Sequence, residues 1–168
     1  MTPDIDVRRG AIGDAPIIVN FNQRMASETE GLDLPLEQLT PGVLSVLAGR
    51  SGAEYFVAEI ESQVVGQLMV TQEWSDWRNG EIWWIQSVYV APEWRRRGVF
   101  TALFEHVVGE GSHLGAVGFR LYVASGNEHA ELVYRKLGFQ RSPYVMMHHC
   151  PEATRVTRRR VGIQLPAP

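Results

Sequence analysis

The 168-residue sequence has few of the features that mark secreted, membrane-spanning or metal-stabilised proteins. Its one cysteine, Cys150, cannot form an intrachain disulfide, and no His and Cys residues are spaced as in a closed zinc site. No apolar run approaches the roughly 18 residues of a transmembrane helix, and the N-terminal MTPDIDVRRG has no apolar signal core. We therefore expect a cytoplasmic protein that holds no metal ion and no membrane contact.

An excess of positive charge is also lacking. The formal net charge is -3, which argues against an electrostatic nucleic-acid binder. Arginines cluster at residues 95–97 and 158–160, but no stacking aromatic residues are interleaved with them. The HHC motif that ends at Cys150 is a poor metal site, because adjacent residues of a strand point to opposite faces. The length is typical of one compact domain, so we expect a single domain over residues 1–168, with a weakly patterned tail from about residue 152.

The hydrophobic pattern predicts helices first, then a β meander, then alternating strands and helices. A strand, a helix and a further strand usually form a right-handed crossover between parallel strands, so we expect a mixed sheet in an α/β (α+β mixed) fold. The first expected elements are a short segment of alternating apolar and polar residues at 5–8, a helix after an N-cap at Asp14, and a helical segment that is broken at Thr40 and Pro41 and ended by Gly49. Two strands within 54–74, separated by ESQ, and a strand at 80–90 follow. The last expected elements are a helix at about 100–108, a strand at 118–123, a helix at about 128–137 that ends at Gly138, and a final strand at 144–149.

The segment RRRGVF, residues 95–100, joins an apolar strand-like run to an apolar helix-like run. At such a junction the first N–H groups of the helix lack intrahelical partners and the helix dipole is positive, so the turn is a natural seat for phosphate. Gly98 would let the main chain approach a phosphate, and the three arginines would neutralise its charge. A solvated basic turn with a packing glycine explains these six residues equally well, so a wider context has to decide.

Two motifs in the right order supply that context. VYVAPEWRRRGVFTALFEHV resembles the acetyl-CoA motif of the GNAT family of N-acetyltransferases, in which Arg or Gln is followed three residues later by Gly, and two residues after that by Gly or Ala. Arg95 and Gly98 match that pattern, whereas Phe100 departs from it. The resemblance implies a GNAT-like sheet, mostly antiparallel and flanked by helices, with a parallel strand pair around an acetyl-CoA cleft. The later segment NEHAELVYRKLGF matches the family at Asn127, Ala130, Tyr134, Leu137, Gly138 and Phe139.

The resemblance also implies which residues bind acetyl-CoA, the acetyl donor. Strand addition suits a linear ligand with amide groups, and it places the thioester carbonyl near a main-chain N–H that can stabilise an oxyanion. Phe100 also fits the apolar stripe of its helix, so we interpret it as packing. Asn127 is expected to contact the pantetheine, although a role as helix N-cap is fully compatible. The implied cofactor-binding residues are Val88, Tyr89 and Val90 beside the pantetheine, Arg95, Arg96, Arg97, Gly98, Val99, Phe100 and Thr101 around the pyrophosphate, and Asn127.

Tyr134 is the residue that the resemblance implies as general acid toward the thioester sulfur. Reference pKa values near 10 for tyrosine and 8.5 for a thiol make full proton donation uphill by roughly 2 kcal/mol, unless the site lowers the tyrosine pKa. Hydrogen bonding to the departing thiolate, with or without proton transfer, is therefore the safer expectation. Packing of a core tyrosine against Val133 and Leu137 is the alternative.

The general base is less clear. An ammonium must lose a proton before it attacks, and the Glu that serves several relatives aligns here with Trp84, while Gln86 cannot act as a base. Acidic residues beside tryptophans would suit a cationic substrate through ion pairing and cation–π contact, although core packing of the tryptophans is an equally good interpretation. The catalytic candidates are Glu73 and Asp76, with Glu81 and either Glu28 or Glu30 as further choices. The substrate-binding candidates are Glu28, Trp74, Trp84 and Gln86.

The leading hypothesis is an acetyl-CoA-dependent N-acetyltransferase that acts on a primary amine by direct transfer in a ternary complex. The preferred substrate is a small cationic molecule. Cys150 lies outside both motifs, which argues against a covalent thiol intermediate. Two alternatives stay open: a non-catalytic acyl-CoA-binding or regulatory module, and an acetyltransferase for a protein or peptide amine. A homodimer is possible, since dimers are common in the family, but no stretch of the sequence specifies an interface.

Overall fold

The computed structural model describes residues 4–147 and 149. The chain divides into two compact units, one ending at Leu121 and the other beginning at Tyr122. The prediction of a single domain over residues 1–168 stays a prediction. No helix among the described residues is long and apolar enough to cross a membrane.

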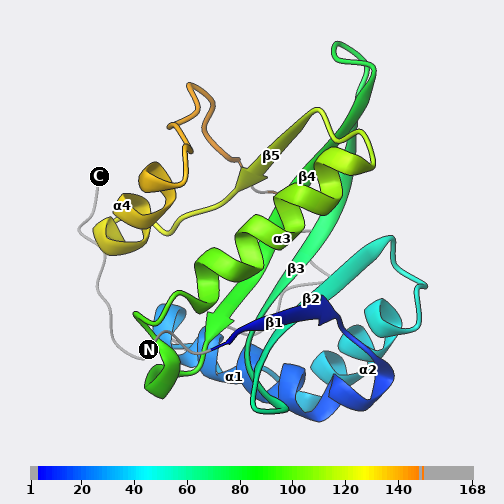
Figure 1. Cartoon of the computed structure of the whole chain (residues 1–168), viewed down its shortest axis with the longest axis vertical. Coiled ribbons are helices and arrows are strands. Elements are labelled where there is room, and N and C mark those ends of the chain that lie inside the picture. The colour runs from blue at the N-terminus through cyan, green and yellow to red at the C-terminus, as the bar shows by residue number, and fades with distance from the viewer. Residues whose placement is uncertain (1–3, 148, 150–168) are drawn as a thin grey trace. The chain divides into compact units, whose positions relative to one another are not determined.

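The first unit is built on a five-stranded mixed sheet with the order β1-β2-β3-β4-β5 (Figure 1). All neighbouring strands are antiparallel except β4 and β5, which are parallel. The expected mixed, mostly antiparallel sheet with one parallel pair is therefore confirmed. The strands are β1 (Asp6–Arg9), β2 (Ala53–Ile60), β3 (Gln63–Ser75), β4 (Gly80–Val90) and β5 (Gly118–Leu121).

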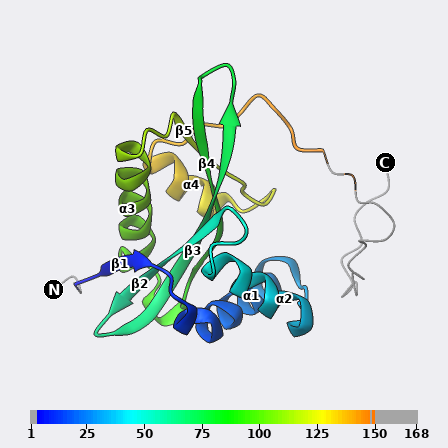
Figure 2. The ribbon, with the colours of Figure 1, turned by 90° about the vertical axis from the view of Figure 1, so that its right-hand side faces the viewer.

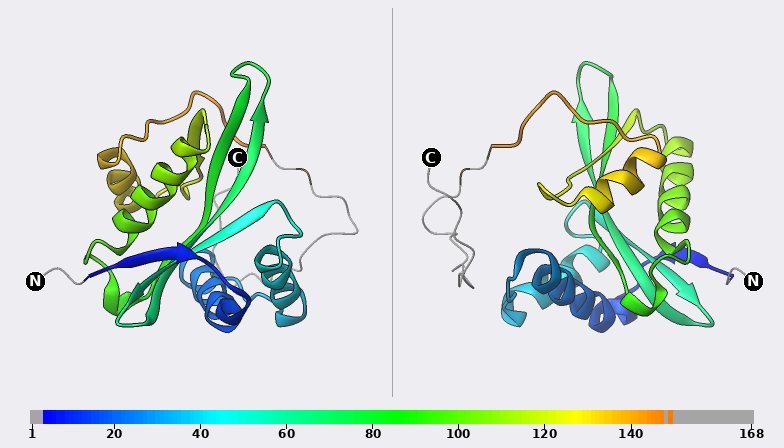
Figure 3. Two further views of the ribbon diagram at one scale, coloured as in Figure 1. Left: turned by 45° about the vertical axis from the view of Figure 1, so that its right-hand side comes forward. Right: turned by 90° about the vertical axis from the view of Figure 1, so that its left-hand side faces the viewer.

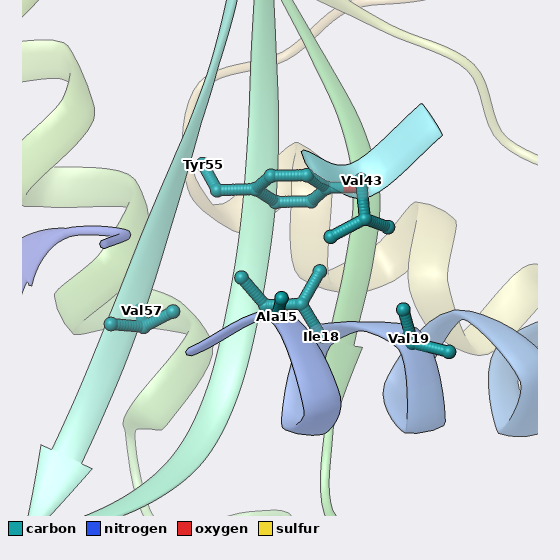
Figure 4. Close-up of a cluster of buried hydrophobic side chains, with 6 residues drawn as sticks. All are labelled: Ala15, Ile18, Val19, Val43, Tyr55 and Val57. Atoms are coloured by element: carbon teal, nitrogen blue, oxygen red, sulfur yellow. The ribbon is translucent and has the colours of Figure 1, made fainter. Parts of the chain in front are cut away.

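Three helices cover this sheet. Helices α1 (Ala15–Glu30) and α2 (Leu36–Leu47) lie on one face, and α3 (Val99–His113) lies on the other (Figures 2 and 3). Apolar side chains of α1 and α2 form a buried cluster with those of β2 (Figure 4). On the opposite face α3 approaches closely at Gly111, where an added Cβ would lie 2.9 Å from the ring of Phe119 and 3.1 Å from Trp83. The cluster in Figure 4 comprises Ala15, Ile18, Val19, Val43, Tyr55 and Val57.

Two helices differ from the prediction. Helix α2 is continuous through Pro41, and no break occurs at Thr40, because Pro41 is exposed and the carbonyl of exposed Glu37, which loses its N–H partner, lies on a solvated helix face. Helix α3 runs to His113 and not to about residue 108, since Gly111 allows the close approach to the sheet described above. In both cases tertiary packing and solvation override the local breaker residue.

Asp14 precedes α1 as predicted, but its side chain does not cap that helix. Its carboxylate accepts a hydrogen bond from the N–H of Ala11 at 2.7 Å and two from Arg8 at 2.8 and 3.0 Å. The Arg8 guanidinium, helped by the Ala11 N–H, holds the pKa of Asp14 below its usual value, against the opposing effect of burial. Asp14 therefore ties β1 to the start of α1.

The predicted hairpin between β2 and β3 and the predicted helix end at Gly49 are found in the structure. The turn between β2 and β3 places Glu61 and Ser62 at φ values of 51° and 63°, as a two-residue turn requires. Gly49, at φ 69°, ends α2: its N–H bonds to the carbonyl of Val46, and the N–H of Arg50 bonds to Ser45.

The second unit contains helix α4 (Glu128–Lys136), which ends at Gly138 with a φ of 91°. The predicted strand at 144–149 is wrong over its described part, because no strand is present at residues 144–147 or 149. The large side chains of this segment are exposed, at 90% for Met147, and no other strand lies in the described part of this unit to pair with it. His148, Cys150 and the tail from 152 lie outside the described residues.

Candidate active site

A β-bulge interrupts β4 a few residues before the basic segment at 95–97. Gln86 pairs with Met69 and Tyr89 pairs with Gln67, so Ser87 and Val88 together face a single residue of β3. Ser87 has a φ of 49°, in the left-handed region that non-glycine residues rarely adopt. The bulge changes the direction of the strand where the pantetheine-binding residues are expected.

Residues 86–90 also have a free edge. The pairing of β4 with β5 ends at Ile85 and Leu121, and within the described part of the chain no strand pairs with 86–90 on that side. One acceptor there is used by the protein, since the carbonyl of Val90 receives a hydrogen bond of 2.9 Å from Nε of Arg95. This stretch therefore presents main-chain groups to which an extended ligand with amides can add as a strand.

Helix α3 begins at Gly98, whose φ of 87° requires glycine or a strained residue. No side chain caps this helix start, and the space where a Cβ of Gly98 would lie is open to at least 4 Å. The N–H groups of the first turn, at Val99, Phe100 and Thr101, lack intrahelical partners and lie at the positive end of the helix dipole. This geometry suits the pyrophosphate role expected of the turn.

The arginines of the turn are mostly engaged with the protein. Nη2 of Arg95 lies 2.5 Å from Oε2 of Glu28, near the end of α1, and the guanidinium of Arg97 lies 5.0 Å from the centre of the Trp94 ring. Arg96 stands at a φ of 62°. Main-chain groups, more than arginine side chains, are thus poised to receive an anion.

Glu28, expected to bind substrate, instead closes a small network. Its Oε1 accepts a hydrogen bond of 2.7 Å from the hydroxyl of Tyr89, and Arg95 and Arg24 lie over the Tyr89 ring at 5.4 and 5.6 Å. Arg95 first, and the Tyr89 hydroxyl second, lower the pKa of Glu28, while burial and Glu28 raise the pKa of Tyr89. Glu28 therefore fastens α1 to the end of β4.

Phe100, the departure from the family motif, packs along the helix. Its ring centre lies 6.2 Å from that of Phe104, one turn further on, with the two planes tilted by 32°. The side chain is half-buried. The interpretation of Phe100 as a packing residue therefore agrees with its position.

A polar group lies on the sheet face that carries α1 and α2. Glu73 on β3 accepts a 2.6 Å hydrogen bond from the indole N–H of Trp84 and a 2.9 Å hydrogen bond from Arg120 on β5. The Arg120 guanidinium also lies 5.5 Å from the Trp84 ring centre. One register step nearer the bulge, the amide of Gln86 donates to Thr71 at 2.6 Å. Of the residues expected to meet the acceptor, the structure brings Glu73, Trp84 and Gln86 together.

The structure does not bring Asp76 or Trp74 to the group formed by Glu73, Trp84 and Gln86. Asp76 lies in the turn at the tip of the β3–β4 hairpin, where it accepts a hydrogen bond from the N–H of Trp77. At about 3.3 Å per residue, this tip lies roughly 20 Å along the strand from the bulge. Trp74 follows Glu73 in the strand, so its 62%-exposed side chain points to the opposite face. Trp83 is 2% exposed and belongs to the core.

In the second unit, the two expected site residues lie on or beside α4. Asn127 is the N-cap of the helix, with its Oδ1 accepting from the N–H of Ala130 at 3.1 Å. Tyr134 packs edge-on against Phe139, with ring centres 6.0 Å apart, and burial raises its pKa. A raised pKa makes full proton donation to a thiolate less favourable, which favours the hydrogen-bonding role.

Sequence reasoning named Gln86 and Val88–Val90, but it did not find Arg120 or the bulge at Ser87. Arg120 is a lone basic residue in a predicted strand, and only the register between β4 and β5 places it beside Trp84. The bulge carries Ser87 where left-handed backbone is usually signalled by Gly or Asn. The one available signal was polar Gln67 inside the otherwise apolar run 64–70 of β3. No three His, Cys, Asp or Glu side chains come together as a metal site within the part of the chain that the structure describes.

Known proteins were compared with the chain on this basis. Residues 22–139 match the family described as the acetyltransferase (GNAT) family. The chain belongs to the GNAT family. No protein with a curated description matches the sequence. A possible acetyltransferase from Clostridium difficile 630 is 39% identical, with a TM-score of 0.81 over 88% of this chain and 97% of the other.

Two more distant structures share the GNAT fold. A predicted acetyltransferase with acetyl-CoA from Clostridium acetobutylicum is 19% identical, with a TM-score of 0.71 over 87% of this chain and 96% of the other. An aminoglycoside acetyltransferase from an uncultured soil metagenomic sample is 18% identical, with a TM-score of 0.69 over 88% of this chain and 95% of the other. At these identities the likeness carries the fold alone.

Proposed function

We propose that this chain transfers the acetyl group of acetyl-CoA to a primary amine of a small cationic molecule, by direct reaction in a ternary complex. The observation that carries the proposal is the continuous stretch from 86 to 101. It combines a bulged strand with one free edge and an uncapped helix start at Gly98. The first part suits the amides of pantetheine, and the second suits a pyrophosphate.

In the proposed reaction the amine nitrogen attacks the thioester carbon, and the negative charge that develops on the carbonyl oxygen is stabilised by a main-chain N–H near Val88. The carbon–sulfur bond then breaks, the electron pair leaves with the coenzyme A thiolate, and the proton that the attacking nitrogen loses as the amide forms passes to that thiolate. Tyr134 donates a hydrogen bond to that thiolate, in line with its raised pKa. No enzyme-bound acetyl intermediate is formed.

The acceptor reaches the reaction as an ammonium and must lose a proton. We assign the binding of the cationic acceptor to Glu73, because its carboxylate lies with Trp84 and Gln86 on one sheet face. The bulge lies about five residues, or roughly 16 Å, along the strand from Glu73, so the proton of the reacting nitrogen leaves through water. The indole of Trp84 adds an aromatic surface for the cation. Arg120 forms an ion pair with the Glu73 carboxylate, so this sheet face carries positive as well as negative charge. A cation that also has polar or anionic substituents therefore fits it.

The test is the release of free thiol from acetyl-CoA across a panel of amines: polyamines, aminoglycosides, amino acids and peptide N-termini. Aminoglycosides are included because one structural neighbour is named for them. We expect release with a small cationic amine. Binding of acetyl-CoA without release for any amine would favour a non-catalytic acyl-CoA module, and release with peptides alone would favour the protein-amine alternative.

Tyr134→Phe tests the proposed role of the hydroxyl. We expect the turnover number to fall by roughly 10- to 100-fold, at or below the lower end of the range for acid–base groups because the hydroxyl only donates a hydrogen bond, while the KM for acetyl-CoA changes little. Tyr144→Phe is the matched control, since Tyr144 lies in the same unit and is 78% exposed. Equal turnover for the two variants would remove the hydroxyl from the mechanism.

A further inference from the structure

The bulge in β4 is held in a conformation that its own residue type disfavours. Ser87 has a left-handed φ of 49°, which costs a non-glycine residue of the order of 1 to 2 kcal/mol. Such a conformation persists only when the surrounding structure imposes it. The groups that impose it here lie beneath the strand.

Four polar residues linked by hydrogen bonds lie under the bulge, and we call them the polar ring: Asn22, Tyr55, Gln67 and Ser87. The amide nitrogen of Gln67 donates to the main-chain carbonyl of Ser87 at 3.3 Å and to Oδ1 of Asn22 at 2.9 Å. The amide nitrogen of Asn22 donates to the Tyr55 hydroxyl at 3.0 Å. Burial raises the pKa of the Tyr55 hydroxyl, whereas Asn22 and Ser87 lower it, so the two ends of this chain of hydrogen bonds lie near each other.

The ring is buried to an extent that polar residues seldom are. Gln67 is fully buried, while Asn22 and Tyr55 are 5% exposed. The Oε1 atom of Gln67 has no hydrogen-bond partner, although it is inaccessible to solvent. An apolar residue at position 67 would avoid that cost, so stability alone is a poor explanation for a glutamine here.

The ring also joins separate elements. Asn22 comes from α1, Tyr55 from β2, Gln67 from β3 and Ser87 from β4. The aromatic side chain of Tyr55 packs in the buried apolar cluster formed by α1, α2 and β2 (Figure 4), so only its hydroxyl belongs to the polar ring. The shape of the bulge is therefore tied to the helix and to two neighbouring strands.

We propose that Asn22, Tyr55 and Gln67 are positioning residues for acetyl transfer: they hold Ser87 in the left-handed conformation and so fix the direction of the main-chain N–H groups that follow it. This inference rests on the proposed function, because those N–H groups are the ones assigned to the thioester carbonyl. A displacement of about 1 Å at such a donor can lower a rate by the order of 100-fold. The ring thus acts on turnover and only weakly on the binding of acetyl-CoA.

The central variant is Gln67→Met, which keeps the length of the side chain and removes both amide groups. We expect turnover to fall by roughly 10- to 100-fold, with less than a threefold change in the KM for acetyl-CoA. The stability control is Val107→Ala, which creates a cavity in α3 on the other sheet face, away from the ring. At a temperature well below both melting transitions, Val107→Ala should keep turnover within threefold of wild type.

A second substitution separates positioning from general damage. Glycine adopts a left-handed φ without steric cost, so a bulge built on glycine depends less on the ring. Adding Ser87→Gly to Gln67→Met should therefore restore turnover by at least threefold. A double variant no faster than Gln67→Met, or a Val107→Ala variant as slow as Gln67→Met, would overturn the proposal.

Amide hydrogen exchange keeps the inference separate from the proposed function. In the unliganded protein, Gln67→Met should raise exchange at residues 86–90 by tenfold or more, while Val107→Ala leaves the difference between this segment and the rest of the sheet unchanged. If the exchange pattern is as expected but the wild-type protein is inactive, the proposed acetyl transfer is wrong, whereas the role of the polar ring in holding the bulge stands. If exchange at residues 86–90 is unchanged in Gln67→Met, the polar ring does not hold the bulge and the proposal is wrong.

Discussion

Gly98→Ala isolates the contribution of the uncapped helix start to acetyl-CoA binding. Gly98 has a φ of 87°, and nothing lies within 4 Å of a Cβ built on it. The cost to folding is therefore conformational and not steric, of the order of 1 to 2 kcal/mol for a non-glycine residue in left-handed backbone. The same methyl group projects into the space by which a pyrophosphate would approach.

Gly115 provides a matched control at the other end of the same helix. It has a φ of 88°, and a Cβ on it also meets nothing within 4 Å. Gly98→Ala and Gly115→Ala should therefore lower the free energy of unfolding in urea by similar amounts. By calorimetry, the Kd for acetyl-CoA should rise about tenfold, or about 1.4 kcal/mol, for Gly98→Ala alone. Equal Kd values for the two variants would refute the assignment of the pyrophosphate to this turn.

Three further substitutions test single contacts. Phe100→Ala removes the contact with Phe104, so we expect unfolding to become easier by about 1 to 2 kcal/mol for a half-buried ring, while calorimetry shows less than a threefold change in the Kd for acetyl-CoA. Glu73→Gln should raise the KM for a cationic amine roughly three- to tenfold through loss of an exposed charge, whereas Glu81→Gln, on the opposite sheet face, should leave it unchanged in steady-state kinetics. Asp14→Asn should lower stability by about 1 kcal/mol at pH 7, discounted for the partial exposure of its arginine partner. Because the pKa of Asp14 is lowered in the folded state, this contribution is present above the unfolded pKa and is lost as pH falls, so the wild-type and variant urea curves should converge below about pH 4.

The fold was largely predictable because its signals are local or depend on order. The alternation of apolar residues gave the meander, and the alternation of strand and helix gave the parallel pair. The errors came from residues whose effect depends on tertiary context. Pro41 and Gly111 look like helix breakers in a sequence, but an exposed helix face tolerates the first and close packing against Phe119 requires the second. The apolar segment from Tyr144 resembles a strand, yet a strand needs a neighbour, and a single sequence does not show one.

The candidate site divides in the same way. The turn around Gly98 and the cap at Asn127 follow from spacing along the chain, since each depends on a few consecutive residues. The group at Glu73 and the polar ring depend on register, which places residues distant in sequence beside one another. Asn22 and Gln67 are 45 positions apart, and they meet only because α1 crosses β3 at that point.

The arginines of the turn show why local charge is a weak guide to its function. Three consecutive cations suggest an electrostatic phosphate site, but Arg95 pairs with Glu28 and Arg97 stacks on Trp94. Two of the three guanidinium groups therefore already contact the protein, whereas the N–H groups of the helix start have no capping side chain. The affinity that follows from such donors depends on backbone geometry, which Gly98 sets, and it is screened by salt less than an exposed ion pair would be. In this turn the glycine, more than the basic residues around it, determines whether the helix start can receive the coenzyme.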